Sequence, residues 1–257
     1  MTFNRRIFLG LLAGSAAASV FGAGSTRHAA IAQPYKAVAF DGFTVFDPRP
    51  LLKLAESLFP GKGTDLSNTW RTRQFEYQWL RALGGRYTDF WQITEDSLVF
   101  AAQTLKLDLT ADKRDQLMQA YLQLTAWPDA AATLRHLKEA GIRLIFLSNL
   151  TRKMLETNTR HAGLEGLFEQ NLSTDQIRSY KPDPKAYEMG VKALGLKRQE
   201  IVFAAFGGWD AAGAKWYGYP TFWVNRMGST EEQLGAAPDA AGPGLNDLAK
   251  FVLARST

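Results

Sequence analysis

The stretch Ala37-Val38-Ala39-Phe40-Asp41 decides the fold of this chain. A short apolar run that ends in a polar turn is typical of a buried strand in a parallel sheet. Three more runs of this kind follow: Arg143-Leu144-Ile145-Phe146-Leu147, Ile201-Val202-Phe203-Ala204-Ala205 and Thr221-Phe222-Trp223-Val224. Helical patterns separate them, for instance Ala131 to Ala140 before Gly141 and Pro184 to Leu194 before Gly195. We therefore predict an α/β fold with a Rossmann-like, mostly parallel sheet that has helices on both faces.

The segment 48–126 shows helical patterns in place of apolar strand runs. These patterns cover Leu51 to Leu58, Leu66 to Leu83 with Ser67 as a candidate cap, Phe90 to Leu105, and Thr110 to Leu124. We predict an inserted all-helical cap domain over residues 48–126, and a discontinuous core formed by residues 33–47 and 127–257. The Ala/Gly/Pro-rich stretch from Gly235 to Gly244 is expected to be a surface loop.

The first 32 residues predict an export signal. Arg5 and Arg6 precede an apolar stretch diluted by Ala and Gly, and this segment contains no acidic residue. The small residues of Ala30-Ile31-Ala32 suit a leader peptidase and place the mature start near Gln33. An uncleaved membrane anchor is the alternative, but the Gly and Ser interruptions make the span weakly apolar. We expect twin-arginine export, cleavage and a periplasmic location.

Composition excludes several kinds of chemistry. The chain has no Cys, so it forms no disulfide and has no thiolate nucleophile. Its three His residues, one of them in the predicted leader, leave little material for a metal centre or a serine hydrolase triad. Part of the net charge of +5 also lies in the leader, which argues against nucleic acid as a partner. The chemistry must come from carboxylates, Lys, Arg and hydroxyl groups.

Polar side chains follow the predicted strands at the points where the strands end. Asp41 ends the first strand, Ser148-Asn149 follow the second, and Asp210 comes shortly after the third. Lys181 precedes the helix predicted to begin at Pro184. Ligands of open parallel sheets bind outside the carboxyl ends of the strands. We therefore expect these carboxylate, hydroxyl and ammonium groups to face a common point.

These motifs resemble the haloacid dehalogenase superfamily. The general pattern is carried by Phe40-Asp41, Leu147-Ser148-Asn149, Tyr180-Lys181-Pro182 and Asp210. A more specific similarity to type II 2-haloacid dehalogenases is carried by Trp70-Arg71-Thr72-Arg73-Gln74-Phe75-Glu76-Tyr77-Gln78-Trp79-Leu80-Arg81, Gly208-Trp209-Asp210-Ala211-Ala212-Gly213-Ala214-Lys215 and Trp223-Val224-Asn225-Arg226. The resemblance covers nearly all of residues 35–255.

The resemblance implies hydrolytic dehalogenation of small 2-haloalkanoic acids to 2-hydroxy acids through an ester on Asp41, without a cofactor. In this scheme Lys181 keeps Asp41 ionised, and Asp210 orients Lys181 or the water. Arg71 of the cap holds the substrate carboxylate or the departing halide. The other substrate-binding residues that the resemblance implies are Thr44, Ser148, Asn149, Tyr187 and Trp209.

The same residues also have structural interpretations. Ser148 is suited to cap a helix, and Asp210 to the favourable end of one. Arg71 is also compatible with a solvated helix face, and Lys181 with the surface. The convergence of these positions on one edge of the sheet favours the catalytic interpretation.

Three segments depart from the family pattern. The loop Asp41-Gly42-Phe43-Thr44 is one residue shorter than the usual family loop. Ala205-Phe206-Gly207 stands where the family has Ser-Ser-Asn, and Leu150 replaces a usual Gly. We expect these departures to act on the half of the mechanism that positions water.

A Mg²⁺-dependent phosphatase of the same superfamily is the main alternative. Such enzymes usually carry further acids where this chain has Phe43 and Phe206, so too few oxygen ligands remain for a hard cation, and no metal is expected. A non-catalytic binder of small carboxylates is the third interpretation. The expected partner is a small haloacid, with no nucleic acid, no stable membrane association after cleavage and, by family habit, a possible homodimer.

We predict that the exported protein begins near Gln33, because Ala30-Ile31-Ala32 follows a twin-arginine segment. N-terminal sequencing of protein from the natural host measures this directly. A full-length product retained in the membrane would contradict the prediction.

Overall fold

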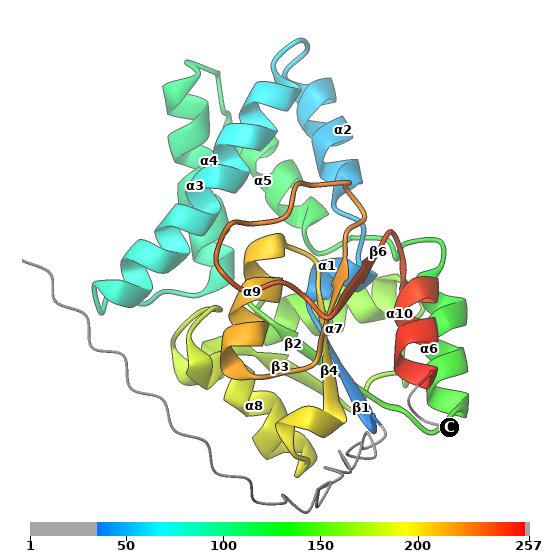
Figure 1. Cartoon of the computed structure of the whole chain (residues 1–257). Helices are drawn as coiled ribbons and strands as arrows, with labels where there is room; N and C mark the ends of the chain where they lie inside the picture. Colours follow the sequence, from blue (N-terminus) through cyan, green and yellow to red (C-terminus); the bar gives the residue numbers. More distant parts are fainter. Residues whose placement is uncertain (1–34, 255–257) are drawn as a thin grey trace, which may run out of the picture. The chain divides into compact units, whose positions relative to one another are not determined.

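The computed structural model describes residues 35–254, so the predicted leader and Gln33 lie outside the described residues. Within that range the strands are β1 (Ala37–Phe40), β2 (Arg143–Ser148), β3 (Gln170–Ser173), β4 (Ile201–Ala205), β5 (Thr221–Val224) and β6 (Ala240–Gly242). They form one parallel sheet in the order β3-β2-β1-β4-β5-β6. This is the strand order of a Rossmann-type sheet, and the predicted fold class is confirmed (Figure 1).

Helices cover both faces of this sheet. The helices that follow the cap are α6 (Ala130–Glu139), α7 (Arg152–His161), α8 (Pro184–Leu194), α9 (Gly208–Tyr217) and α10 (Leu245–Leu253). Side chains of β1 alternate between two apolar clusters, because successive strand residues point to opposite faces. Val38 and Phe40 pack with residues of α6, α7 and α10, whereas Ala37 and Ala39 pack with residues of α8 and α9. Every residue of β1 is buried, as the apolar run predicted.

A group of helices lies between the first two strands in sequence. They are α2 (Arg49–Leu58), α3 (Gly63–Leu83), α4 (Phe90–Thr104) and α5 (Ala111–Ala120), and we call them the cap. Figure 1 shows them beyond the end of the sheet where α1 (Gly42–Val45) follows β1. The chain enters and leaves the cap side by side, since Phe46 pairs with Ala126 and the Asp47 N–H donates to the Thr125 carbonyl at 2.8 Å.

Most helix ends follow from local side-chain chemistry. Asp89, Thr110, Thr151 and Asp183 accept backbone N–H groups at the starts of their helices. Gly195 ends α8 with a φ of 65°, a conformation that favours glycine.

The start of α3 differs from the sequence-based expectation. Ser67 lies inside this helix, which begins at Gly63. The carboxylate of Glu56, near the end of α2, accepts the N–H groups of Gly61 at 2.6 Å and Gly63 at 2.9 Å. A preceding helix therefore supplies the acceptor that Ser67 was predicted to supply.

The two outer strands, β3 and β6, were not predicted from the sequence. β6 lies within the stretch 235–244, which was expected to be a loop, and Ala241 pairs with Trp223 of β5. β3 is partly exposed and reads Gln-Asn-Leu-Ser, so it lacks the apolar run that marks the central strands. Both strands are recruited by pairing with a neighbour, a contact that local sequence does not record. Among residues 35–254, none of the helices combines the length and apolar character that a membrane crossing requires.

Candidate functional site

Asp41 lies at the carboxyl end of β1, between β2 and β4, where the strand order reverses. Ligands of this fold bind at that point. The Asp41 carboxylate accepts the Phe43 N–H at 3.0 Å, and the Thr44 hydroxyl donates to the Asp41 carbonyl at 2.6 Å. The shortened loop is thus the single helical turn α1, with Asp41 as its N-cap.

Two side chains from outside the turn fix its carbonyl groups. Trp127 donates its indole N–H to the Phe43 carbonyl at 3.0 Å. Arg226 donates to the Thr44 carbonyl at 3.0 and 3.1 Å and pairs with Asp129 at 2.8 Å. The Arg226 guanidinium lies 4.6 Å from the centroid of the Trp127 ring, so these two neighbouring side chains together hold the backbone that follows Asp41.

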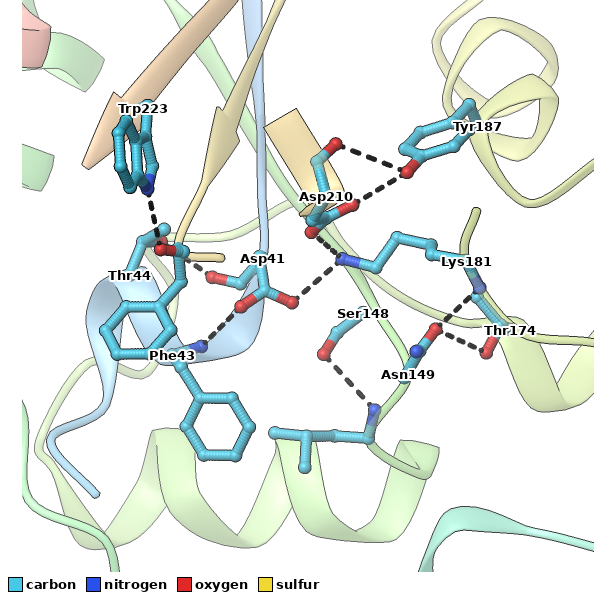
Figure 2. A network of polar contacts seen from close by, with 12 residues as sticks. Asp41, Phe43, Thr44, Ser148, Asn149, Thr174, Lys181, Tyr187, Asp210 and Trp223 are labelled. Carbon is cyan, nitrogen blue, oxygen red and sulfur yellow. Dashed lines mark hydrogen bonds and ion pairs between the residues drawn. The ribbon is translucent and has the colours of Figure 1, made fainter. Parts of the chain in front are cut away.

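Lys181 joins the two carboxylates of the site. Its Nζ donates to Asp41 Oδ1 at 2.8 Å and to Asp210 Oδ2 at 2.5 Å, as Figure 2 shows. The Lys181 side chain is 0% exposed, so the surface interpretation of this residue is wrong. A buried ammonium requires such partners, because burial of an unpaired charge is costly.

Burial and charge act in opposite directions on Lys181. Burial alone lowers the pKa of the ammonium, but the carboxylates of Asp210 and Asp41 raise it by more than burial lowers it, so the pKa ends above its usual value. Lys181 is therefore cationic at neutral pH.

Asp210 is the group whose charge state changes near neutrality. Burial raises its pKa, the Asp41 carboxylate raises it further, and Lys181 lowers it, so that the pKa is about 6. Tyr187 donates its hydroxyl to Asp210 Oδ1 at 2.8 Å. Burial and the neighbouring Asp210 raise the pKa of Tyr187 well above its usual value, so the phenol stays a proton donor. Asp210 also lies in the first turn of α9, as its helix-end interpretation required.

Ser148 and Asn149 lie at the end of β2. Ser148 Oγ accepts the Leu150 N–H at 3.2 Å, but the cap of the following helix α7 is Thr151, so Ser148 is not a helix cap. Asn149 Oδ1 accepts the backbone N–H of Lys181 at 3.0 Å and the Thr174 hydroxyl at 3.2 Å (Figure 2). These bonds tie the end of β2 to the segment that carries Lys181.

A cavity of about 220 Å³ opens between this edge of the sheet and the cap. Predicted site residues that line it are Asp41, Arg71, Ser148, Asn149, Trp209 and Asp210. Arg71 comes from α3, and its guanidinium lies 5.7 Å from the centroid of the Phe75 ring. Phe43 and Phe206, whose ring centroids are 6.0 Å apart, give the cavity an apolar wall beside Asp41.

Lys181, Thr44 and Tyr187 do not line this cavity. For Thr44 and Tyr187 this corrects the expectation of direct substrate contact. Both hydroxyl groups are fully buried and are used within the protein, on the Asp41 carbonyl and on Asp210. Thr44 and Tyr187 therefore hold Asp41 and Asp210 in place without facing the cavity.

Residues missed from the sequence complete the site. Gln78, a buried residue of α3, accepts the Asn149 side-chain N–H at 2.8 Å, and Trp79 donates to the Lys181 carbonyl at 3.2 Å. The available signal is the spacing Leu66, Trp70, Gln74, Gln78, in which two glutamines continue a buried stripe begun by apolar residues.

The donor set does not fit a divalent metal. Among residues 35–254, no group of three or more His, Asp or Glu side chains is arranged to hold a metal ion. The two carboxylates at the site are both bonded to the Lys181 ammonium, and the rings of Phe43 and Phe206 lie beside Asp41. Mg²⁺ is usually bound through one or two carboxylates together with several waters, and here both carboxylates already hold the Lys181 ammonium.

Comparisons with known proteins point to one family. A family model for haloacid dehalogenase-like hydrolases matches residues 29–218. The (S)-2-haloacid dehalogenase of Pseudomonas sp. (strain YL) is 42% identical over 205 residues, covering 79% of this chain and 88% of that protein. The haloacetate dehalogenase of Moraxella sp. (strain B) is 37% identical over 218 residues, covering 84% of this chain and 97% of that protein.

Solved structures give the same result. The L-2-haloacid dehalogenase from Xanthobacter autotrophicus, with chloropropionic acid covalently bound, superposes with a TM-score of 0.79. It is 34% identical, and the match covers 85% of this chain and 98% of that one.

The raised pKa of Asp210 has a measurable effect on stability. Since the folded-state pKa of about 6 exceeds the ordinary value of 3.8, its contribution is complete at low pH and is lost as the pH rises through about 6. We expect the unfolding free energy of the wild type, minus that of Asp210→Asn, to fall between about pH 4 and pH 6. Urea titrations at each pH measure this difference. A difference that rises over this range would contradict the assignment.

Proposed function

We propose that this chain, which belongs to the haloacid dehalogenase-like hydrolases, removes halogen from small 2-haloalkanoic acids by hydrolysis and forms 2-hydroxy acids. The observation that carries the proposal is the buried Lys181 ammonium held between Asp41 and Asp210, with both carboxylates on the cavity wall. The relative with chloropropionic acid covalently bound supports a covalent route.

Asp41 is the nucleophile in the first half of the reaction. A carboxylate oxygen attacks the carbon that bears the halogen, the new C–O bond forms as the carbon–halogen bond breaks, and the halide leaves with the electron pair. The Lys181 ammonium at 2.8 Å holds this carboxylate by a charge-assisted hydrogen bond and fixes its direction. No base is needed at this step, because an ionised carboxylate is already a nucleophile.

Asp210 serves the second half. Water attacks the carboxyl carbon of the Asp41 ester and gives one proton to Asp210. The bond between that carbon and the substrate oxygen then breaks, the second proton of the water goes to the leaving oxygen, and the 2-hydroxy acid leaves as the Asp41 carboxylate re-forms. The proton later passes to solvent, which balances the hydrolysis. A pKa of about 6 suits this role, since Asp210 is largely ionised at neutral pH and still basic enough to accept a proton.

Arg71 and the end of β2 bind the anions. A guanidinium and fixed N–H and O–H donors suit both the substrate carboxylate and the departing halide. Arg71, Ser148 and Asn149 line the same cavity as Asp41, and Trp209 adds an indole to its wall. Phe43 and Phe206 give an apolar surface for the carbon–halogen group. Thr44 and Tyr187 support Asp41 and Asp210 from behind.

Two other functions receive less support. A Mg²⁺-dependent phosphatase needs acids at positions occupied here by Phe43 and Phe206. A non-catalytic carboxylate binder leaves the Asp41–Lys181–Asp210 arrangement unexplained, because burial of charged groups carries a large desolvation cost and a binder needs no buried carboxylates. Turnover of 2-chloropropionate with and without a chelator separates the three functions.

We further propose that the enzyme works in the periplasm after twin-arginine export and cleavage near Gln33. Support comes from Arg5, Arg6 and the Ala30-Ile31-Ala32 segment. After cleavage, its partner is the small haloacid, without nucleic acid and without a stable membrane association. A homodimer is the proposed assembly.

Arg71→Lys tests the anion site. It replaces a planar, bidentate donor by a point charge, so we expect kcat/KM for 2-chloropropionate to fall at least about tenfold, or about 1.4 kcal/mol. Arg73→Lys is the matched control, because Arg73 lies on the same helix but over the Phe100 ring, 4.0 Å from its centroid. Equal kinetics of the Arg71→Lys variant and the wild type would return Arg71 to the solvated-helix interpretation.

A single turnover in ¹⁸O-labelled water tests the nucleophile. We expect the new oxygen of the first-turnover product to be unlabelled because it comes from Asp41, and the label to appear in the Asp41 carboxylate. Mass spectrometry of the product and of the peptide containing Asp41 measures both. Labelled oxygen in that product would mean direct attack by water. Activity that a chelator abolishes would refute the metal-free part.

A further inference from the structure

The side-chain amide of Asn149 is fixed by three neighbours. Its Oδ1 accepts from the Lys181 backbone N–H at 3.0 Å and from the Thr174 hydroxyl at 3.2 Å, and its Nδ2 donates to Gln78 Oε1 at 2.8 Å. The amide oxygen is therefore committed to the core. Of the two N–H groups on Nδ2, one is bonded to the cap, and the other remains for an anion in the cavity that Asn149 lines.

Gln78 is the cap's contribution to this arrangement. Its side chain is 0% exposed, and its own Nε2 donates to the Gln74 carbonyl one turn earlier at 3.2 Å. That bond leaves Oε1 as the end that faces Asn149. Gln78 also lines the cavity, seven positions after Arg71 on α3.

The neighbour of Gln78 holds the same core segment. Trp79 donates its indole N–H to the Lys181 carbonyl at 3.2 Å, while the Lys181 N–H donates to Asn149. Consecutive residues of α3 thus hold the two backbone polar groups of Lys181, one directly and one through Asn149. The ammonium of this same residue joins Asp41 to Asp210.

We propose that Gln78 is a positioning residue that acts through Asn149. Gln78 orients the free Asn149 N–H toward an anion bound in the cavity. It also keeps the Lys181 backbone in the position from which the ammonium reaches the two carboxylates. Without the Gln78 acceptor, a buried N–H of Asn149 loses its partner. The unsatisfied donor raises the free energy of the present amide orientation, which favours rotation of the amide. A turned amide presents its oxygen to an anion and withdraws the acceptor from the Lys181 N–H. The catalytic consequence rests on the proposed dehalogenase function, whereas the backbone consequence does not.

The first test measures the backbone without any substrate. Gln78→Met keeps the length of the side chain and removes the acceptor. We expect the Lys181 backbone amide to exchange with solvent deuterium at least about tenfold faster, relative to the Phe203 amide in β4, which bonds to the Pro220 carbonyl. The Phe203 reference removes any effect of lower global stability. An unchanged ratio would overturn the proposal.

The second test is a double-mutant cycle on kcat/KM for 2-chloropropionate. We expect Gln78→Met to lower kcat/KM at least about tenfold in the wild type, and less than about twofold in the Asn149→Ala background. A residue that acts through Asn149 has nothing left to position once that side chain is gone. Equal losses in both backgrounds would show a merely structural role and overturn the proposal.

Thr94→Val is the matched control for both tests. It removes the hydroxyl to which Gln74 Nε2 donates at 2.7 Å. The variant therefore loses a hydrogen bond from a side-chain amide of α3 within the cap. We expect it to lower the melting temperature while both the exchange ratio and kcat/KM stay within about twofold of the wild type. Changes in this control as large as those in Gln78→Met would overturn the assignment to Asn149.

The tests remain decisive if a variant does not fold and if the proposed function is wrong. If Gln78→Met does not fold, Gln78→Ser carries the same expectations, because its hydroxyl is too short to reach Asn149. If the wild type fails to turn over 2-chloropropionate, the proposed function is in error, and the exchange ratio alone decides whether Gln78 holds Lys181.

Discussion

The buried Lys181 ammonium is the constraint on which the rest of the site depends. Two of its bonds join residues 140 and 29 positions away in sequence, at the end of β1 and at the start of α9. Removing one partner from such a buried group costs about 3–5 kcal/mol, because the remaining charge stays unpaired. The site is therefore formed only when the sheet, α9 and the segment before α8 are all in place.

The central strands and the strand-end residues were predictable because their signals are local. An apolar run followed by Asp41 fixes both a buried strand and the end at which its carboxylate lies. The edge strands β3 and β6 were not predictable in this way, since their residues are polar or small and partly exposed. Their strand geometry comes from pairing with a central neighbour.

Roles within the site depend on directions that sequence does not give. The family resemblance implied that Thr44 and Tyr187 bind substrate, but both hydroxyl groups are bonded within the protein, to the Asp41 carbonyl and to Asp210. Gln78 was missed because its sequence signal, a place in the buried stripe of α3, is also what a packing residue would give. Its significance lies in a bond to Asn149 that spans 71 residues and joins the cap to the core. Such bonds follow from the closed packing of the two parts.

The same packing accounts for the altered segment after β4. A Cβ atom on Gly207 would lie 2.7 Å from the indole nitrogen of Trp209, and that indole packs against Phe75 and Trp79 at 5.4 and 5.6 Å between ring centroids. A polar side chain at position 207 would therefore need the space that the indole occupies. In the proposed mechanism, ester formation relies on Asp41, Lys181 and Arg71, which match the family pattern. In the same mechanism, hydrolysis of the ester relies more heavily on Asp210 and on backbone groups, because Ala205 and Gly207 offer no side-chain donor. The second half of the reaction is thus where the physical chemistry of this chain departs from the family pattern.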